Sequence, residues 1–248
     1  MFDAKQAKQQ MTKWIADFFQ NNGSPETKAI IGISGGKDSS IVAALCVEAL
    51  GKNRVLGVLM PCGEQHDIDI AFDLCKVLDI EYIEVNIDKP TQALYDAITA
   101  TRLTLNSVAT FNTPARIRMA TLYAVSGIVG GMVANTSNLS EDWVGYATKF
   151  GDSAGDFSPL SDMTVAEIKA VGRELGLASK FIDKVPADGL CDKTDEENLG
   201  FTYEVLDKYI REGICDVTIT KDRIDQLHKM NLHKVTPMPK FSGKGLLT

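Results

Sequence analysis

A short stretch near the N-terminus places hydroxyl, glycine and charged residues directly after an apolar run. Residues 28–33 read KAIIGI, and the run SGGKDSS follows at residues 34–40. From Ile41 the apolar positions recur with helical spacing, so this stretch predicts a buried strand that turns into a helix N-terminus. Glycines let a backbone approach a ligand closely, and the N–H groups and dipole of a helix start attract phosphate. The stretch therefore predicts a phosphate-binding loop.

The spacing of this loop excludes the Walker A type. A Walker A loop requires four residues between its glycines and a hydroxyl residue after its lysine. Here three residues separate Gly32 from Gly36, and Asp38 follows Lys37. A turn whose glycines serve only tight packing is the alternative, but a carboxylate at a bare anion site would be unfavourable. Asp38 therefore favours a site that also holds a cation.

A second polar stretch, TSNLSEDWVGYATKFGDSAGD at residues 136–156, follows another apolar run and is poor in core residues. Loops of this kind at strand ends carry function more often than packing. Asp38 and Glu141 would project from strand ends on one edge of a sheet. Two carboxylates and phosphate oxygens can complete the oxygen shell that magnesium prefers. A solvated surface loop is the alternative for this stretch.

The elements that position these residues alternate between strand and helix. Apolar runs predict strands at 28–33, 55–60, 82–87 and 131–135, and helical periodicity predicts helices at 2–20, 39–50, 67–78, 90–105 and 114–129, with a loop at 106–113. Beyond residue 160 we expect helices at 164–175, 201–211 and 220–230, and a polar loop or helix start at 193–197. This alternation predicts an α/β fold with a doubly wound parallel sheet and its ligand at the carboxyl ends of the strands. We expect one domain, residues 1–248, with a helical C-terminal third.

Composition narrows the function classes. The 248 residues carry 26 Lys and Arg against 33 Asp and Glu, a net charge of −7, which argues against a sequence-independent grip on nucleic acid. No apolar run reaches the length of a membrane span, and the N-terminus does not resemble a signal peptide, so we expect a soluble, cytoplasmic protein without a membrane partner. Five scattered cysteines and three histidines without ligand spacing predict no disulfide framework, zinc site or histidine metal site.

Six motifs in register resemble those of one family. SGGKDSS resembles the SGGxDS loop of the ATP pyrophosphatases, which break ATP between its α and β phosphates. The further motifs are NTPARIRM at 112–119, NTSNLSE at 135–141, GYATKFGD at 145–152, PADGLCDKTDEENLG at 186–200, and HK at 233–234. Their order across residues 30–234 is similar to that of the NAD synthetases within this superfamily.

The resemblance implies a role for each matching position. It implies a loop for the ATP pyrophosphate made of Ser34, Gly35, Gly36, Lys37, Asp38, Ser39 and Ser40, with a further ATP contact at Thr136. Asp38 and Glu141 resemble the Mg²⁺ ligands, and Lys37 would help to neutralise charge. The positions that match the binding of deamido-NAD are Arg116, Lys149, Asp156, His233 and Lys234. Asp152 would position or deprotonate ammonia.

The resemblance also implies a fold, a reaction and an assembly. The fold would be like that of the adenine nucleotide alpha hydrolases, with a five-stranded sheet in the order 3-2-1-4-5. The reaction would be the amidation of deamido-NAD to NAD, with ATP as co-substrate and an acyl adenylate as intermediate. Free ammonia would be the nitrogen source unless a separate glutaminase subunit delivers it, because the synthetase motifs leave no room for a glutaminase domain. The protein would be a homodimer, with helices 2–20 and 114–129 as candidates for its interface.

Four positions depart from the family pattern, and other functions stay open. Val165, Ala187 and Leu59 stand where the family often has a lysine, a hydroxyl residue and an arginine, so fewer side chains would hold ATP. Val235 stands where the family has the third residue of its HKR motif. The alternatives are a GMP-synthetase-like amidase, a tRNA-thiolating ligase and a non-catalytic nucleotide sensor. The scattered cysteines argue against thiolation. The paired acidic residues Asp38 and Glu141 argue against a sensor, which needs no metal carboxylates.

Overall fold

A four-stranded parallel sheet forms the centre of the computed structural model, which describes residues 2–65, 68–183 and 194–242. The strands are β1 (Lys28–Gly32), β2 (Val55–Leu59), β3 (Glu81–Glu84) and β4 (Gly131–Val133). Their order in the sheet is β3-β2-β1-β4, and every neighbouring pair is parallel. The predicted α/β class, the parallel sheet and the order of these four strands are confirmed.

The burial of each strand follows its sequence. All five residues of β2 and the middle three of β1 are buried, as expected for the apolar inner strands of a parallel sheet. β3 is an edge strand, and it exposes Glu81, Tyr82 and Glu84. Charged side chains on an edge strand disfavour pairing with a further strand. The sheet therefore buries β1, whose carboxyl end leads into the SGGKDSS loop.

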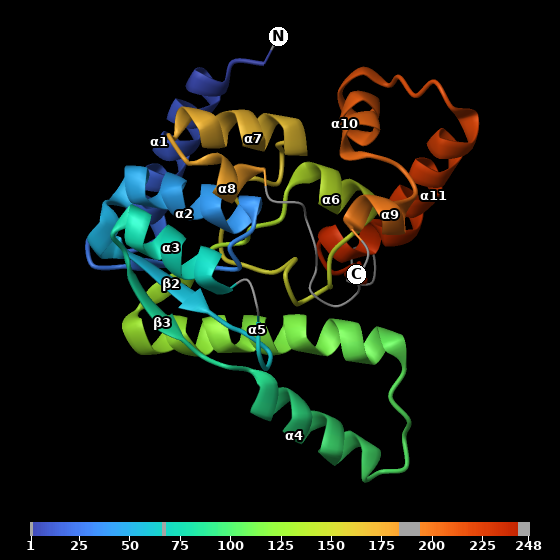
Figure 1. The fold of residues 1–248 in the computed structure, drawn as a ribbon, viewed down its shortest axis with the longest axis horizontal. Helices are drawn as coiled ribbons and strands as arrows, with labels where there is room; N and C mark the ends of the chain where they lie inside the picture. Colours follow the sequence, from blue (N-terminus) through green and yellow to red (C-terminus); the bar gives the residue numbers. More distant parts are fainter. Residues whose placement is uncertain (1, 66–67, 184–193, 243–248) are drawn as a thin grey trace, which may run out of the picture.

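Helices cover both faces of the sheet (Figure 1). One face packs against α1 (Ala4–Asn22), α2 (Lys37–Leu50), α3 (Ile68–Leu78), α7 (Val165–Glu174) and α8 (Ser179–Ile182). Their apolar side chains meet Ile31 and Leu59 in the larger core. The opposite face packs against α5 (Ser107–Val129), whose Met119, Leu122 and Val125 meet Ile30. Helices on both faces confirm the doubly wound arrangement.

The prediction of a loop at 106–113 is wrong. The helix α4 (Asp88–Thr99) ends earlier than expected, and α5 already begins at Ser107. The side chain of Asn106 caps the longer helix and accepts the N–H of Ala109 at 2.9 Å. Pro114 lies inside the helix and has no N–H for the carbonyl of Thr110. The hydroxyl of Tyr95 on α4 donates to that carbonyl instead, at 3.0 Å. The hydrogen bond from Tyr95 thus satisfies the carbonyl of Thr110, for which Pro114 has no N–H to donate.

The fifth strand predicted for the sheet is not formed among the described residues. Within residues 2–65, 68–183 and 194–242, only an isolated parallel bridge between Ala134 and Phe157 extends the sheet beyond β4. Pro159 follows two residues later and has no N–H to continue a ladder. The chain at this edge therefore makes one bridge and turns away.

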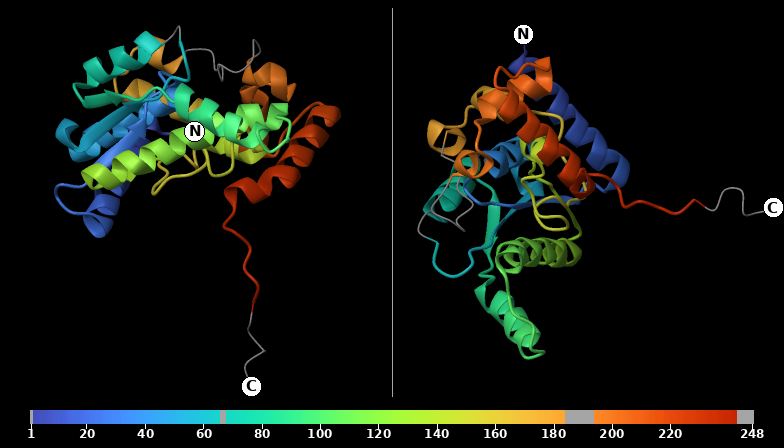
Figure 2. Two further views of the ribbon diagram at one scale, coloured as in Figure 1. Left: turned by 90° about the horizontal axis from the view of Figure 1, so that it is seen from below. Right: turned by 90° about the vertical axis from the view of Figure 1, so that its right-hand side faces the viewer.

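The C-terminal third is helical, as predicted. Its last three helices, α9 (Asp195–Leu199), α10 (Tyr203–Glu212) and α11 (Thr218–Val235), form a separate apolar cluster with the earlier helix α6 (Leu139–Val144). Val144, Leu206 and Ile224 pack together at the centre of this cluster. Residues 236–242 extend away from the body after α11 (Figure 2). Within the described ranges, the helices are too short or too polar to cross a membrane.

Candidate active site

The phosphate-binding loop predicted after β1 is a tight turn into α2. Gly35 has a φ of 77°, and a Cβ placed on it would lie 3.1 Å from the main-chain nitrogen of Ala71. A side chain here would be strained by both its conformation and its neighbour. Gly36 caps α2 with extended backbone, and its N–H donates to the hydroxyl of Ser34 at 3.2 Å. The N–H groups of the first turn of α2 thus face the carboxyl end of the sheet without helical partners.

Two of the serines support this turn from inside. The hydroxyls of Ser39 and Ser40 donate to the carbonyl of Gly36, at 3.2 Å and 2.7 Å. Both side chains are buried. The hydroxyls of Ser34 and Ser39 also lie 3.2 Å apart. These contacts fix the shape of the loop, and the predicted role of the serines in binding ATP stays a prediction.

Asp38 and Glu141 lie together, and we call them the two-carboxylate site. Asp38 lies in the first turn of α2, and Glu141 lies in α6, which follows β4. The Nζ of Lys37 is 2.8 Å from Asp38 Oδ2 and 3.2 Å from Glu141 Oε1. The lysine side chain is 3% exposed, and the two acidic side chains are 20% and 17% exposed. Residues about a hundred positions apart in sequence thus converge on one cation.

Asn138 joins the two acidic residues, and the sequence analysis assigned it no role. Its Nδ2 donates to Asp38 Oδ1 at 2.9 Å. Its Oδ1 accepts the N–H of Glu141 at 3.1 Å and so caps α6. Asparagine three residues before an acidic residue is a helix-cap signal that could have identified it.

The charge balance of the two-carboxylate site depends on the ammonium group of Lys37. Burial acts to lower the pKa of Lys37, but the charges and hydrogen bonds of Asp38 and Glu141 outweigh it and hold the pKa above its ordinary value. Burial, and then the charge of Asp38, raise the pKa of Glu141. The ring of Tyr203 on α10 lies 5.7 Å from Lys37 Nζ and adds a cation–π contact.

The donor set fits a magnesium ion whose shell is completed by other oxygens. Two carboxylates that converge on one positive charge are the oxygen ligands that Mg²⁺ takes from proteins, together with phosphate and water. No group of three or more His, Cys, Asp or Glu side chains gathers as a metal site in the part of the chain that the structure describes. The protein would therefore supply a partial shell, as suits a metal that arrives with a nucleotide.

Four of the five positions predicted to bind deamido-NAD lie together, and we call Arg116, Lys149, His233 and Lys234 the basic cluster. Arg116 Nε donates to the carbonyl of Lys149 at 3.2 Å, and Lys149 Nζ donates to the carbonyl of His233 at 2.6 Å. Lys234 Nζ donates to the carbonyl of Gly145 at 2.7 Å. These acceptors are carbonyls, so the contacts themselves do not neutralise the charges of Arg116, Lys149 and Lys234, although the charge of Asp152 acts on Lys234. The cluster suits an anionic ligand.

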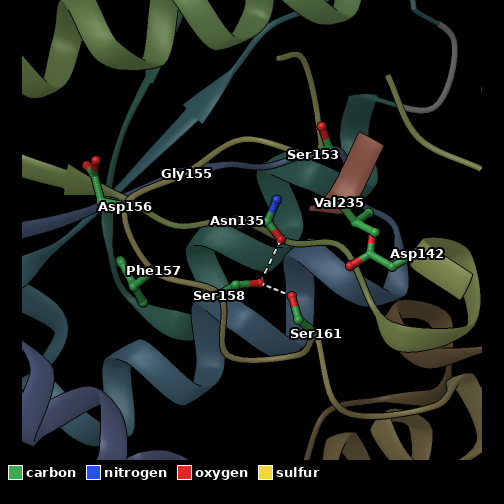
Figure 3. Close-up of a pocket in the computed structure, with 9 residues that line it drawn as sticks. All are labelled: Asn135, Asp142, Ser153, Gly155, Asp156, Phe157, Ser158, Ser161 and Val235. Atoms are coloured by element: carbon green, nitrogen blue, oxygen red, sulfur yellow. Dashed lines mark hydrogen bonds between the residues drawn. The ribbon is translucent and has the colours of Figure 1, made fainter. Parts of the chain in front are cut away.

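Asp156, the fifth of these positions, is tied to the sheet. Its Oδ2 accepts the N–H of Val133 at 2.8 Å, and its Oδ1 accepts the hydroxyl of Tyr123 at 3.1 Å. In Figure 3 its carboxylate points away from Asn135 and Ser158. These contacts anchor the chain that follows β4, and the predicted substrate role of Asp156 stays a prediction.

Asp152 holds the turn that carries Lys149 of the basic cluster. Its Oδ1 accepts the N–H of Thr148 at 2.9 Å, and its carbonyl accepts Nδ2 of Asn135 at 2.8 Å. Desolvation by the surrounding chain raises its pKa. Thr136 lies half-buried just beyond β4 and precedes Glu141 in sequence. The structure places both residues on the carboxyl side of the sheet.

A polar cavity of about 290 Å³ lies beside these residues (Figure 3). Asn135, Ser158 and Ser161 form a hydrogen-bonded row along it, with 2.8 Å between Ser158 Oγ and Asn135 Oδ1. Asp142, the neighbour of Glu141, lines the same cavity, as does Val235 at the end of α11. A polar ligand would find hydrogen-bonding groups here.

Two of the departures from the family pattern are core positions, whereas Val235 at the end of α11 is exposed. Leu59 is fully buried in β2, and Val165 is buried at the start of α7. Ala187 lies outside the described residues. Arg118, which the sequence analysis did not single out, donates from Nε to the carbonyl of Met60 at 3.0 Å, at the carboxyl end of β2. Arg118 therefore brings a guanidinium group to the carboxyl end of β2, where Leu59 replaces the arginine of the family.

Comparisons with known proteins agree on one family. The family model described as NAD synthase matches residues 7–242. An NH(3)-dependent NAD(+) synthetase of Finegoldia magna is 37% identical over 228 residues, which cover 90% of each chain. The structure of an NMN synthetase from Francisella tularensis superposes with a TM-score of 0.87 and 30% identity, and covers 97% of this chain and 100% of that one. An NH3-dependent NAD synthetase from Campylobacter jejuni gives a TM-score of 0.77 and 29% identity, with 98% and 100% covered.

Proposed function

Because the chain belongs to the NAD synthase family, we propose that it is a carbon–nitrogen ligase that amidates deamido-NAD with ammonia to form NAD and uses ATP as co-substrate. The observation that carries this function is the pairing of Asp38 and Glu141 at the phosphate-binding loop, within a chain that the family model matches over residues 7–242. The rival nucleotide sensor would not need this pair.

We propose a reaction in two steps. The nicotinate carboxylate attacks the α-phosphorus of ATP, pyrophosphate leaves, and an acyl adenylate forms. Ammonia then attacks the acyl carbon, and AMP leaves. Adenylation is needed because the carboxylate by itself would have to expel oxide. Magnesium, when bound by Asp38 and Glu141, supplies charge neutralisation for the phosphates.

The protein's own groups position the reactants. The N–H groups at the start of α2 and the turn at Gly35 would hold the pyrophosphate. The basic cluster would bind the phosphates of deamido-NAD. Asp152, held by Thr148, would orient ammonia or take its proton. Catalysis by such a site consists mainly of orientation and charge stabilisation.

A mononucleotide substrate is the second candidate. The structural neighbour with a TM-score of 0.87 is an NMN synthetase, whereas the Campylobacter jejuni NAD synthetase gives 0.77. The corresponding acid would be nicotinic acid mononucleotide, which has the same nicotinate carboxylate and lacks the adenylate half. The chemistry at the two-carboxylate site would be unchanged.

A direct assay tests both substrates. Purified protein, ATP, magnesium and ammonium chloride are mixed with deamido-NAD, nicotinic acid mononucleotide or xanthosine monophosphate, and the amide product and AMP are measured. NAD and AMP in equal amounts, both lost in Asp38→Ala, support the proposed function. A larger kcat/KM for the mononucleotide supports the second candidate. ATP binding without an amide from any acid contradicts both.

We also propose a homodimer in the cytoplasm. Ile128 on α5 is 83% exposed, and Val129 on the same helix and Trp14 on α1 are exposed as well, so both helices predicted for the interface carry exposed apolar side chains. Exposed apolar area of this kind often marks a protein interface. Sedimentation at micromolar concentration tests the dimer, and a monomer would contradict it. Cell fractionation tests the location.

A further inference from the structure

Lys37 lies where a metal ion at the two-carboxylate site would lie. Its Nζ is within 2.8 Å of Asp38 and 3.2 Å of Glu141, and it donates a hydrogen bond to each. A metal bound to both acidic residues would have to occupy the same space between them. The ammonium group and the metal therefore cannot share the site.

The charges at the site also indicate that the ammonium group and a metal ion cannot be bound together. Two acidic side chains withdrawn from water repel each other unless a cation lies between them. Lys37 supplies that cation, and Asn138 supplies one further hydrogen bond to Asp38. A divalent ion that approached while the ammonium remained would be repelled by it. The site accordingly holds one cation at a time.

The ammonium group of Lys37 could also reach a phosphate bound at the start of α2. Lys37 is the first residue of α2, so its side chain starts beside the N–H groups that face a bound phosphate. Its four-carbon stem is flexible, and its ammonium is a compact partner for phosphate oxygens. A nucleotide phosphate would offer the ammonium new acceptors when it leaves the acidic residues.

We propose that Lys37 is an internal counter-cation that occupies the two-carboxylate site until a divalent metal and a nucleoside triphosphate arrive together, and then moves to the phosphates. The lysine makes the protein a poor ligand for metal alone and couples metal binding to nucleotide binding. This inference rests on the metal role of Asp38 and Glu141 in the proposed function. It adds a role for Lys37 that is distinct from contact with the reacting atoms.

The test measures metal binding in the absence of nucleotide. Mn²⁺ is titrated into the nucleotide-free protein, and the free ion is followed by electron paramagnetic resonance. Lys37→Gln removes the charge but keeps a hydrogen-bond donor, and it should bind Mn²⁺ at least about tenfold more tightly than wild type. Lys37→Arg keeps the charge and should bind as weakly as wild type. Equal Mn²⁺ affinity in Lys37→Gln and wild type would overturn the proposal.

Lys28→Gln is the matched control. Lys28 pairs with Glu81 at 2.6 Å at the start of β1, the end of the strand opposite the site. This variant makes the same chemical change and breaks an ion pair elsewhere, so its Mn²⁺ affinity should equal that of wild type. A similar gain in affinity in this control would overturn the assignment to Lys37.

Thermal unfolding gives a second measurement. Without metal, Lys37→Gln should unfold at a lower temperature than wild type, and Mn²⁺ should restore its Tm while leaving wild type nearly unchanged. A variant that stays unfolded at every Mn²⁺ concentration would overturn the proposal, because the metal would then be unable to replace the ammonium.

The assay for NAD separates the two proposals. If wild type forms no amide but Lys37→Gln gains Mn²⁺ affinity, the proposed function fails and the counter-cation role remains. If wild type forms NAD and the affinity of the variant does not change, only the counter-cation role fails.

Discussion

Removal of the Asn138 side chain should weaken the protein through two separate contacts. The residue is fully buried, caps α6 through Glu141 and donates to Asp38. Loss of a helix cap costs about 1 kcal/mol. Loss of a hydrogen bond to a charged group costs about 1.5–3 kcal/mol. Asn138→Ala should therefore lower the free energy of unfolding by about 2.5–4 kcal/mol in the metal-free protein.

A second substitution separates these contacts. Serine caps a helix about as well as asparagine but is too short to reach Asp38 Oδ1, which lies 2.9 Å from the present amide. Asn138→Ser should therefore lose only the part that belongs to Asp38, about 1.5–3 kcal/mol. Because the amide orients both proposed metal ligands, kcat/KM should fall in both variants, by roughly 10–100-fold.

Urea denaturation followed by circular dichroism measures the free energy of unfolding, and the NAD assay measures kcat/KM. An alanine variant as stable as wild type would refute both contacts. Equal losses in the alanine and serine variants would refute the separation into a cap and a hydrogen bond. Unchanged kcat/KM in both would refute the role of Asn138 in orienting the acidic residues.

Three further outcomes are expected. Gly35→Ala should lose more stability than Gly176→Ala in urea denaturation, because both glycines have positive φ but only Gly35 has neighbouring atoms within 4 Å; equal losses would contradict this. Tyr95→Phe should lower the free energy of unfolding by about 1 kcal/mol, because the carbonyl of Thr110 loses its donor. Adding Pro114→Ala to this variant should restore the lost stability, since alanine supplies the missing N–H. A double variant no more stable than Tyr95→Phe would contradict the role of Tyr95. Lys149→Met should raise the KM for deamido-NAD roughly tenfold with little change in kcat, measured by steady-state kinetics, and an unchanged KM would exclude a substrate contact.

Much of the fold was predictable because its signals are local. The apolar runs of β1 and β2 and the glycines that follow β1 indicate a buried parallel strand and a loop after it, and the structure has both. The errors arose where distant groups decide local structure. Tyr95 donates to the carbonyl that Pro114 leaves without a donor within α5, and in the described part of the chain one bridge at Phe157 stands in place of the fifth strand.

The features of the candidate site also fall into those that the sequence predicted and those that only the structure revealed. Residue types placed Asp38 and Glu141 among the functional candidates, because carboxylates beside a glycine loop carry their chemistry in any fold. The basic cluster was identified only from the resemblance of its motifs to those of the NAD synthetases. Only the tertiary structure decided that Lys37 lies between the two acidic residues and that Asn138 joins them, since these contacts bring α2 and α6 together across the end of the sheet. It also tied Asp156 to β4, because an N–H of that strand lies within hydrogen-bonding distance of its carboxylate. Chemical character is a property of the residue, whereas its partner is set by the packing of the whole chain.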